Sequence, residues 1–216
     1  MCFLPPQIIR GWCNIREFSD EGEQKRVMGK VAVIDIDNTL WQFCDAFYEE
    51  LRKINSTFPT PDEWTAFDIW EGYCSEADFF NAIHRIHVQQ DSTAYQPYPE
   101  AGGFLSTLKE KGFYLIIASH RSPDTRNQTE RWLARHGLVY DELHLSYDKT
   151  ILFTRTDVVV DDSPYNLEKA LETGVLGTGL LFPWNRPCAD NGFRLFQNLN
   201  GVLRYILSMT GPPSRR

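Results

Sequence analysis

Short apolar segments alternate with helical segments from residue 31 onward, and this alternation constrains the fold more than any other feature of the sequence. Continuous apolar runs are typical of strands that are buried on both faces, as in parallel sheets covered by helices. The strongest runs are Val31–Ile34, Tyr114–Ala118, Val158–Val160 and Gly179–Phe182, and a weaker one is Glu142–Leu145.

Proline and glycine mark the helices between these runs. Pro at the first helical position and Gly just past the last one is the usual asymmetry of helix ends. Such pairs are Pro99 and Gly112, Pro123 and Gly137, and Pro164 and Gly174. A further helix is expected at 193–209. Repeated strand–helix units predict an α/β protein, a three-layer α/β/α Rossmann-like parallel sheet with right-handed crossovers.

The segment 41–98 interrupts this alternation, because a single crossover does not need so many residues. It holds nearly half of the Phe, Tyr and Trp residues. Helices are expected at 45–55 and 75–88, and Ser75 with Asp78 forms a candidate capping pair for the second. The segment is therefore predicted to be a small helical cap whose rings pack its own core or face a ligand. The expected division is an arm at 1–28, a core at 29–40 and 99–210, a cap at 41–98 and a loose tail at 211–216.

Composition and the N-terminal sequence exclude several classes of function. The net charge of −7 disfavours binding to a nucleic-acid polymer. No apolar run reaches the roughly 18 residues of a membrane span. The N-terminus lacks a basic stretch before its apolar residues and breaks at Pro5-Pro6, which argues against a secretory signal. The five cysteines form no C-x-x-C pair, so a reducing, cytoplasmic location fits best.

Polar residues follow the predicted strands at the edge where parallel α/β sheets bind ligands. They are Asp35 and Asp37 after the first strand, Ser119, His120 and Arg121 after the second, Lys149 after the weak strand, and Asp161 and Asp162 after the fourth. Burying four carboxylates without a positive partner would cost several kcal/mol. One lysine is too little compensation, and Mg²⁺ suits a site made only of oxygen ligands. We therefore expect Mg²⁺ as the cofactor.

The order Asp35-x-Asp37-x-Thr39-Leu40, Ser119, Lys149 and Asp161-Asp162 resembles the four motifs of the haloacid dehalogenase superfamily across residues 31–183. The insert at 41–98 falls where that superfamily places its C1 cap. The resemblance implies a phosphatase in which Asp35 attacks phosphorus and forms an aspartyl-phosphate. Asp37 would protonate the leaving group and then deprotonate water, for which a raised pKa is expected.

The same resemblance assigns the ligand-binding residues. Mg²⁺ would bind Asp35, the backbone carbonyl of Asp37 and one of the late pair, with Asp162 preferred to Asp161. Lys149 and Ser119 would bind the phosphoryl oxygens, together with Thr39 and Arg121. Arg121 could equally pair with a surface carboxylate.

Two related classes fit less well. Dehalogenases of the superfamily lack a carboxylate at the position of Asp37, because a halide leaving group needs no proton. Two-component receiver domains share the Asp, Ser/Thr and Lys residues but place the acidic pair early, and this chain is too long for one. Phosphoryl transfer is the chemistry that the residue pattern favours.

The late segment is similar to the 5′(3′)-deoxyribonucleotidase family, in which an acidic pair and a turn are followed by a P-W-N-R-like stretch, here 183–186. The chain departs from that family in having Asn38 where Gly is usual and in its second motif. The resemblance implies a small phosphorylated substrate, a nucleoside monophosphate, whose base could stack on Phe43, Phe47, Trp70 or Trp41 in the cap. Trp41 could instead support the loop that follows Asp37.

Three alternatives remain open at this stage. The substrate could be another small phosphorylated metabolite such as a sugar phosphate, or the fold could be kept as a non-catalytic binding protein. A homodimer is also left open.

Among the remaining polar and aromatic residues, Trp184 is expected to pack near the Lys149 loop or to face the site, and Asn166 to hold a metal-bound water or to cap a helix. The histidines at 84, 87, 136 and 144 are expected on the surface without a metal role.

Overall fold

The structure, a computed structural model, describes residues 29–66 and 69–211 of the 216-residue chain. Among these residues, six parallel strands form one sheet in the order β3-β2-β1-β4-β5-β6. The central strands β1 and β4 are buried along their whole length, as expected from their uninterrupted apolar sequences. The strands are β1 (Val31–Ile34), β2 (Tyr114–Ser119), β3 (Glu142–Leu145), β4 (Val158–Val160), β5 (Leu176–Leu180) and β6 (Arg194–Phe196).

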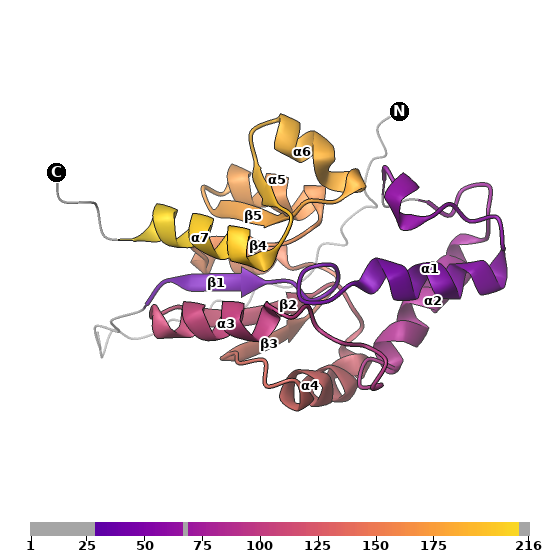
Figure 1. The fold of residues 1–216 in the computed structure, drawn as a ribbon, viewed down its shortest axis with the longest axis horizontal. Helices are drawn as coiled ribbons and strands as arrows, with labels where there is room; N and C mark the ends of the chain where they lie inside the picture. Colours follow the sequence, from indigo (N-terminus) through magenta and orange to yellow (C-terminus); the bar gives the residue numbers. More distant parts are fainter. Residues whose placement is uncertain (1–28, 67–68, 212–216) are drawn as a thin grey trace, which may run out of the picture.

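Helices cover both faces of this sheet (Figure 1). On one face, α3 (Ala101–Glu110), α4 (Arg126–Arg135) and α7 (Leu199–Thr210) share a hydrophobic cluster with Ile34 and Val160. On the other face, α5 (Pro164–Glu172) and the 3₁₀ helix η3 (Thr150–Arg155) pack on Val33 and Val159. The predicted α/β/α architecture is therefore confirmed. Shorter helices are η2 (Pro123–Thr125), η4 (Pro183–Asn185) and α6 (Arg186–Asp190).

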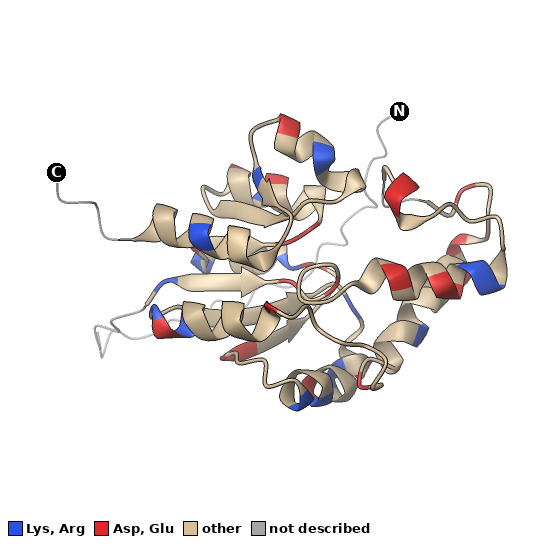
Figure 2. Cartoon of the chain, in the orientation of Figure 1, with Lys and Arg blue, Asp and Glu red and all other residues tan. Residues whose placement is uncertain are grey.

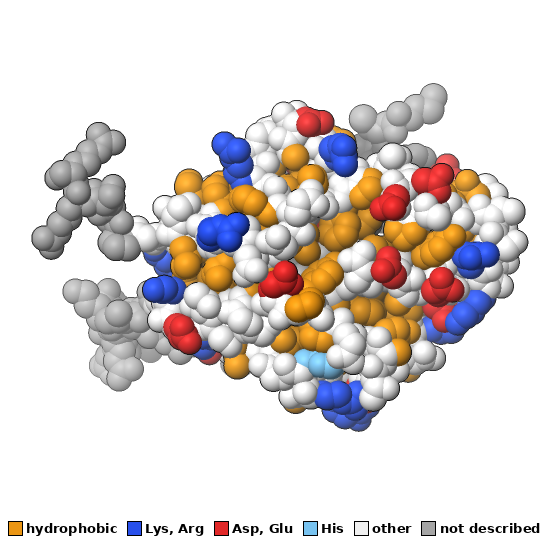
Figure 3. Space-filling view, viewed as in Figure 1, with side chains coloured by type: hydrophobic (Ala, Val, Ile, Leu, Met, Phe, Trp, Pro, Cys, Tyr) orange, Lys and Arg blue, Asp and Glu red, His pale blue; other side chains and the backbone are white. Residues whose placement is uncertain are grey.

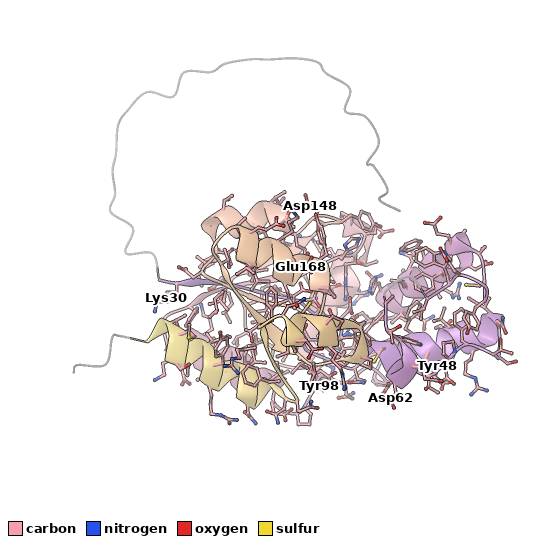
Figure 4. The ribbon with its side chains drawn as sticks, turned by 90° about the horizontal axis from the view of Figure 1, so that it is seen from above. Lys30, Tyr48, Asp62, Tyr98, Asp148 and Glu168 are labelled. Carbon is pink, nitrogen blue, oxygen red and sulfur yellow. The ribbon has the colours of Figure 1, made fainter. Side chains whose placement is uncertain are left out.

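The inserted segment forms α1 (Phe43–Ile54), the short η1 (Pro61–Glu63) and α2 (Glu76–Val88). As predicted, the Ser75 side chain caps α2 by accepting a hydrogen bond from the Asp78 backbone N–H. Both long helices lie beyond the end of the sheet at which β1 finishes, and Figure 4 places Lys30 and Tyr48 at opposite ends of the molecule. The assignment of 41–98 as a cap domain remains a prediction.

The inserted helices pack on the core through hydrophobic side chains. Phe47 of α1, Phe79 of α2 and Leu105 of α3 belong to one continuous cluster. Hydrophobic side chains also gather on the molecular surface where α1 meets the core (Figure 3). Because one cluster spans the two parts, the inserted helices and the sheet stabilise each other.

Most of the predicted bounds agree with the structure to within two residues, and two elements differ by more. The run expected at 179–182 overlaps β5 only at its first two residues, because the strand begins at Leu176 and ends at Leu180. The helix expected at 193–209 is wrong in its first part, because Arg194–Phe196 pairs with β5 as strand β6. The helix α7 begins only after Asn198, whose side chain accepts from the Gly201 backbone N–H. Phe196 fits the helical period of the apolar residues that follow, so periodicity alone could not separate the two elements.

Several expectations concern features that the structure describes only in part. The arm predicted at 1–28 and the tail predicted at 211–216, apart from Gly211, lie outside the described residues. Within the described ranges, no helix combines the length and the apolar character that crossing a bilayer requires. Cys44, Cys74 and Cys188 are free thiols.

Candidate active site

The polar residues that follow the strands converge at one edge of the sheet. Asp35 follows β1, Lys149 follows β3, and Asp161 and Asp162 follow β4. Acidic residues directly follow β1 where the chain turns towards α1 (Figure 2). Parallel strands bring these ends together, which places residues 35, 149, 161 and 162 around one point although they are distant in sequence.

Lys149 lies at the centre of this cluster. Its Nζ is 2.6 Å from Asp35 Oδ1 and 2.7 Å from Asp161 Oδ2. Asp161 also accepts from Asn166 Nδ2 (3.1 Å) and from the Ser163 backbone N–H (2.9 Å). Burial alone would lower the pKa of Lys149, but the two carboxylates raise it. Lys149 is therefore a permanent positive charge at the base of the site.

Three carboxylates surround this single ammonium group. Asp35, Asp161 and Asp162 are all buried, and each offers an oxygen within 4.8 Å of the others. Burial raises the pKa of Asp35 to about 7, against the opposing effect of Lys149. Burial and the nearby Asp35 carboxylate also raise the pKa of Asp162 well above its usual value. With all three ionised, the cluster carries more negative charge than Lys149 can balance.

Asp162 is fixed by two donors on the same oxygen. Its Oδ2 accepts from Asn38 Nδ2 at 3.1 Å and from Trp184 Nε1 at 3.2 Å. Asn38 has a φ of 57°, a left-handed conformation that Asn tolerates better than most residues other than Gly. Its Oδ1 accepts from the Cys44 backbone N–H at 2.8 Å. Asn38 therefore satisfies the turn geometry and links the start of α1 to Asp162.

Asp37 belongs to a separate network of donors. Arg121 Nη2 contacts both of its oxygens at 2.8 and 2.7 Å, and Trp41 Nε1 donates to Oδ1 at 2.9 Å. Ser119 Oγ lies 3.2 Å and His87 Nε2 3.1 Å from Oδ2. Burial would raise the pKa of Asp37, but Arg121 and His87 hold it well below its usual range. The expectation of a raised pKa for Asp37 is wrong. Nothing in the sequence indicated that Arg121 and His87 would contact this carboxylate.

Arg121 is buried rather than paired with a surface carboxylate. Besides Asp37, its guanidinium donates to Ser119 Oγ at 2.8 Å, Gln90 Oε1 at 3.2 Å and Thr129 Oγ1 at 3.0 Å. The surface alternative considered for this residue is therefore wrong. Arg121 and Ser119 are held by Asp37, and neither lines the cavity described below.

Thr39 is placed differently from the other residues expected to bind phosphate. It is completely buried, and its hydroxyl has no hydrogen-bond partner among the described residues. It does not line the cavity either. Lys149 is thus the one member of that predicted set that lines the cavity, and the phosphate-binding roles of the other three remain predictions.

His87 was expected on the surface, and this expectation is wrong. The side chain is only 4% exposed and points from α2 to Asp37. Its position continues the buried face of the helix, which carries Phe79, Ala82 and Ile86. This spacing, with His87 eight residues after Phe79, was the signal in the sequence that could have placed the imidazole inside.

A cavity of about 680 Å³ lies between the carboxylate cluster and the inserted helices. Asp35, Lys149 and Asp162 line one side of it, and Phe43, Phe47 and Trp70 are among the rings on the other. The predicted cap residue Trp41 does not line it and instead supports Asp37. Further lining rings that the sequence did not single out are Trp64, Phe79 and Phe80 in the insert and Tyr147 and Tyr165 in the core, and Trp184 also lines the cavity from the core.

Trp184 and Asn166 have defined places in this arrangement. Trp184 stacks on Phe182 with 4.5 Å between ring centroids and directs its indole N–H to Asp162. It therefore faces the site. Asn166 donates to Asp161 and so fixes a carboxylate of the cluster.

Comparison with known proteins gives one sequence family and one structural class. The sequence model of the family described as 5′ nucleotidase, deoxy (pyrimidine), cytosolic type C protein matches residues 29–191. No match was found among curated proteins. Several solved structures share the fold at 15–16% identity, a level at which likeness shows the fold alone.

Three of these structures illustrate the extent of the similarity. A haloacid dehalogenase-like hydrolase from Streptococcus pneumoniae has a TM-score of 0.59 and 15% identity, over 83% of this chain and 99% of the other. A predicted phosphoglycolate phosphatase from Haemophilus somnus has a TM-score of 0.59 and 15% identity, over 84% and 99%. A hydrolase of the same class from Deinococcus radiodurans, solved with bound phosphate and sodium, has a TM-score of 0.55 and 16% identity, over 84% and 96%.

Proposed function

Because the chain belongs to the family of cytosolic type C 5′-nucleotidases and has the fold of haloacid dehalogenase-type hydrolases, we propose that it is a Mg²⁺-dependent phosphatase acting on nucleoside monophosphates. The observation that carries the proposal is the buried cluster of Asp35, Lys149, Asp161 and Asp162 at the base of an aromatic cavity. A cytoplasmic location, expected from the cysteine pattern, is part of the proposal.

The carboxylate cluster fits a hard divalent cation. Three ionised carboxylates and one ammonium leave two negative charges, which Mg²⁺ would balance. Among the described residues, donors reach Asp35 only at Oδ1 and Asp162 only at Oδ2, whereas both oxygens of Asp161 accept hydrogen bonds. Asp35 and Asp162 are therefore the proposed carboxylate ligands, with the Asp37 backbone carbonyl. When bound, the ion would neutralise charge on the phosphoryl oxygens and on the nucleophile.

Asp35 is the proposed nucleophile. One of its carboxylate oxygens would form a bond to phosphorus as the bond from phosphorus to the leaving oxygen breaks, which gives an aspartyl-phosphate. Lys149 Nζ lies 2.6 Å from Asp35 Oδ1 and so fixes the orientation of the carboxylate. Its permanent positive charge would also stabilise the negative charge on the transferring phosphoryl group.

Asp37 is the proposed acid and base. In the first step its proton would pass to the leaving oxygen, and in the second it would accept a proton from the water that attacks the aspartyl-phosphate. The second step releases phosphate and restores Asp35. The five hydrogen bonds to Asp37 favour its carboxylate form, so it would take up from solvent the proton that it donates in the first step. The proton accepted from water in the second step replaces it.

The rings of the cavity support a nucleotide as the substrate. Phe43, Phe47 and Trp70 present flat apolar surfaces opposite the carboxylates. Stacking of a base on such rings contributes about 1–3 kcal/mol and tolerates different bases. If the substrate were another small phosphorylated metabolite, or if the role were non-catalytic binding, the rings that line the cavity would need a different explanation.

A panel of phosphomonoesters tests the proposal. Phosphate release from p-nitrophenyl phosphate, nucleoside 5′- and 3′-monophosphates and sugar phosphates is measured with and without Mg²⁺. We expect release that needs Mg²⁺, is fastest for a nucleotide and falls by about 10³-fold or more in Asp35→Asn. Asp124→Asn, at an exposed carboxylate, is the matched control and should behave like wild type.

Each other outcome has a definite meaning. Fast release from a sugar phosphate and slow release from every nucleotide would contradict the substrate class but keep the phosphatase. Equal activity of wild type and Asp35→Asn would contradict the nucleophile. Absence of turnover on the whole panel, with Mg²⁺ bound, would favour a binding protein.

A further inference from the structure

His87 connects an inserted helix to the proposed acid. It lies near the C-terminal end of α2, and its Nε2 is 3.1 Å from Asp37 Oδ2. An ionised carboxylate can only accept hydrogen bonds, so in that form of Asp37 the imidazole N–H is the donor in this contact. The other partners of Asp37, which are Ser119, Arg121 and Trp41, lie outside α1 and α2. His87 is thus the direct contact between α2 and this carboxyl group.

The surroundings of His87 indicate that the contact is more than packing. The imidazole lies beside the Phe43 ring, with 5.5 Å between centroids, on a helix face that is otherwise apolar. A leucine or phenylalanine would fill this volume without the cost of burying a polar ring. What the histidine adds at this position is a hydrogen-bond donor directed to Asp37.

A second buried contact joins the same region of the chain to the same network. Gln90, two residues after the end of α2, is completely buried and accepts from Arg121 Nη1 at 3.2 Å. Arg121 in turn contacts both oxygens of Asp37. The end of α2 therefore reaches Asp37 directly through His87 and indirectly through Gln90 and Arg121.

We propose that His87 is a positioning residue through which helix α2 holds the Asp37 carboxyl group in the orientation needed for proton transfer to the leaving group. The proposal rests on the proposed function, because it assigns His87 a role in that same reaction. The His87–Asp37 contact then links the seating of the inserted helix against the core to the alignment of the acid. Helix α2 also supplies Phe79, Phe80 and Ile83 to the cavity wall, so the element that surrounds the substrate also aligns the acid.

The leaving group provides the readout. The alkoxide of a nucleoside needs a proton as it departs, whereas p-nitrophenolate is stable without one, so only the first depends strongly on a well-placed acid. His87→Phe keeps a ring beside Phe43 and removes the donor. We expect it to lower kcat by about tenfold or more on the alkyl phosphomonoester that wild type hydrolyses fastest, and by less than about threefold on p-nitrophenyl phosphate.

Three further variants complete the comparison. His84→Phe makes the same substitution one turn earlier on α2, where the side chain is 45% exposed, and should leave both rates unchanged. His87→Gln restores a donor and should recover part of the kcat on the alkyl substrate. Asp37→Asn removes the acid and should show the largest difference between the rate losses on the two substrates. His87→Phe should show a fraction of that difference. Equal effects of His87→Phe on both substrates, or no effect on either, would overturn the proposal.

A stability cycle tests the contact whether or not the protein turns over a substrate. Urea unfolding of wild type, His87→Phe, Asp37→Asn and the double variant measures the coupling between the two side chains. We expect the two single effects to be non-additive, and additive effects would overturn the proposal. If the cycle shows coupling but wild type is inert on every phosphomonoester, the proposed function fails and with it the catalytic role of the contact, while the contact itself stands.

Discussion

Asp35 and Asp37 are two residues apart, yet their surroundings move their pKa values in opposite directions. Burial raises the pKa of Asp35 to about 7, whereas Arg121 and His87 hold that of Asp37 well below its usual range. A cation bound beside Asp35 would favour the ionised form that a nucleophile needs. The sequence predicted that these two residues share one site, but it could not predict their pKa values. The burial of Asp35 and the contacts of Arg121 and His87 with Asp37 arise from tertiary packing.

The raised pKa of Asp35 predicts that protons and Mg²⁺ compete for its carboxylate. The folded-state pKa of about 7 lies above the ordinary value of 3.8, so without metal the folded state binds the proton more tightly than the unfolded state does. Stability from this group is therefore present at low pH and is lost as the pH rises through about 7. Mg²⁺ favours the ionised form and should reverse the loss.

The measurement is the melting temperature at pH 5.5 and pH 8, with and without Mg²⁺. We expect Mg²⁺ to raise the melting temperature more at pH 8 than at pH 5.5. Each kcal/mol added to the free energy of unfolding corresponds to about 2–4 °C in a protein of this size. Asp35→Asn removes the titrating group and should reduce this difference between the two pH values. A Mg²⁺ effect that is larger at pH 5.5 would contradict the assignment.

At the scale of elements, strands whose own residues carry a pattern could be predicted, even the weak run at 142–145, whereas a strand without a pattern could not. The bounds of β3 and β4 agree with the sequence patterns at 142–145 and 158–160. The strand β6 was missed because its three residues, Arg194–Phe196, carry no alternation of their own and depend on pairing with β5. Local sequence therefore predicts a strand that shows a pattern of its own, whereas β6 is defined only by its pairing with β5.

Strand β5 shows how tightly an element can be fitted to the site. A Cβ placed on Gly179 would lie 2.0 Å from the Asp161 backbone oxygen, whereas one on Gly177, in the same strand, would meet its nearest atom at 3.4 Å. Backbone atoms of Asp161 cannot move aside without displacing its carboxylate from Lys149. Gly179 therefore permits β4 and β5 to approach each other directly beside the proposed metal site.

We expect Gly179→Ala to destabilise the fold by about 2 kcal/mol or more and to weaken Mg²⁺ binding, because overpacking forces the backbone to shift. Gly177→Ala is the matched control and should cost less than about 1 kcal/mol. Urea unfolding and Mg²⁺ titration of both variants check this. Similar stability and similar Mg²⁺ affinity in the two variants would contradict the argument from close approach.

At the scale of the whole molecule, the sheet and the inserted helices enclose the site between them. The sequence predicted the parallel sheet, the insert and the carboxylates at the strand ends, because each depends on local patterns. It did not predict that α2 would bring His87 to Asp37, since this contact needs the packing of Phe79 and Ile86 against the core. The packing of the insert on the core, between residues distant in the sequence, thus determines the contact between His87 and Asp37 that the sequence did not predict.

The central claim is that Asp35 carries the phosphoryl group during turnover, and chemical trapping tests it most directly. The protein is mixed with Mg²⁺ and its best substrate, quenched within one turnover and treated with borohydride, which reduces an acyl phosphate to an alcohol. Peptide mass spectrometry then locates the modified residue. The account predicts homoserine at position 35 in wild type and in Asp124→Asn, and none in Asp35→Asn. Turnover at the wild-type rate with no modification at Asp35, or modification at another carboxylate, would contradict it.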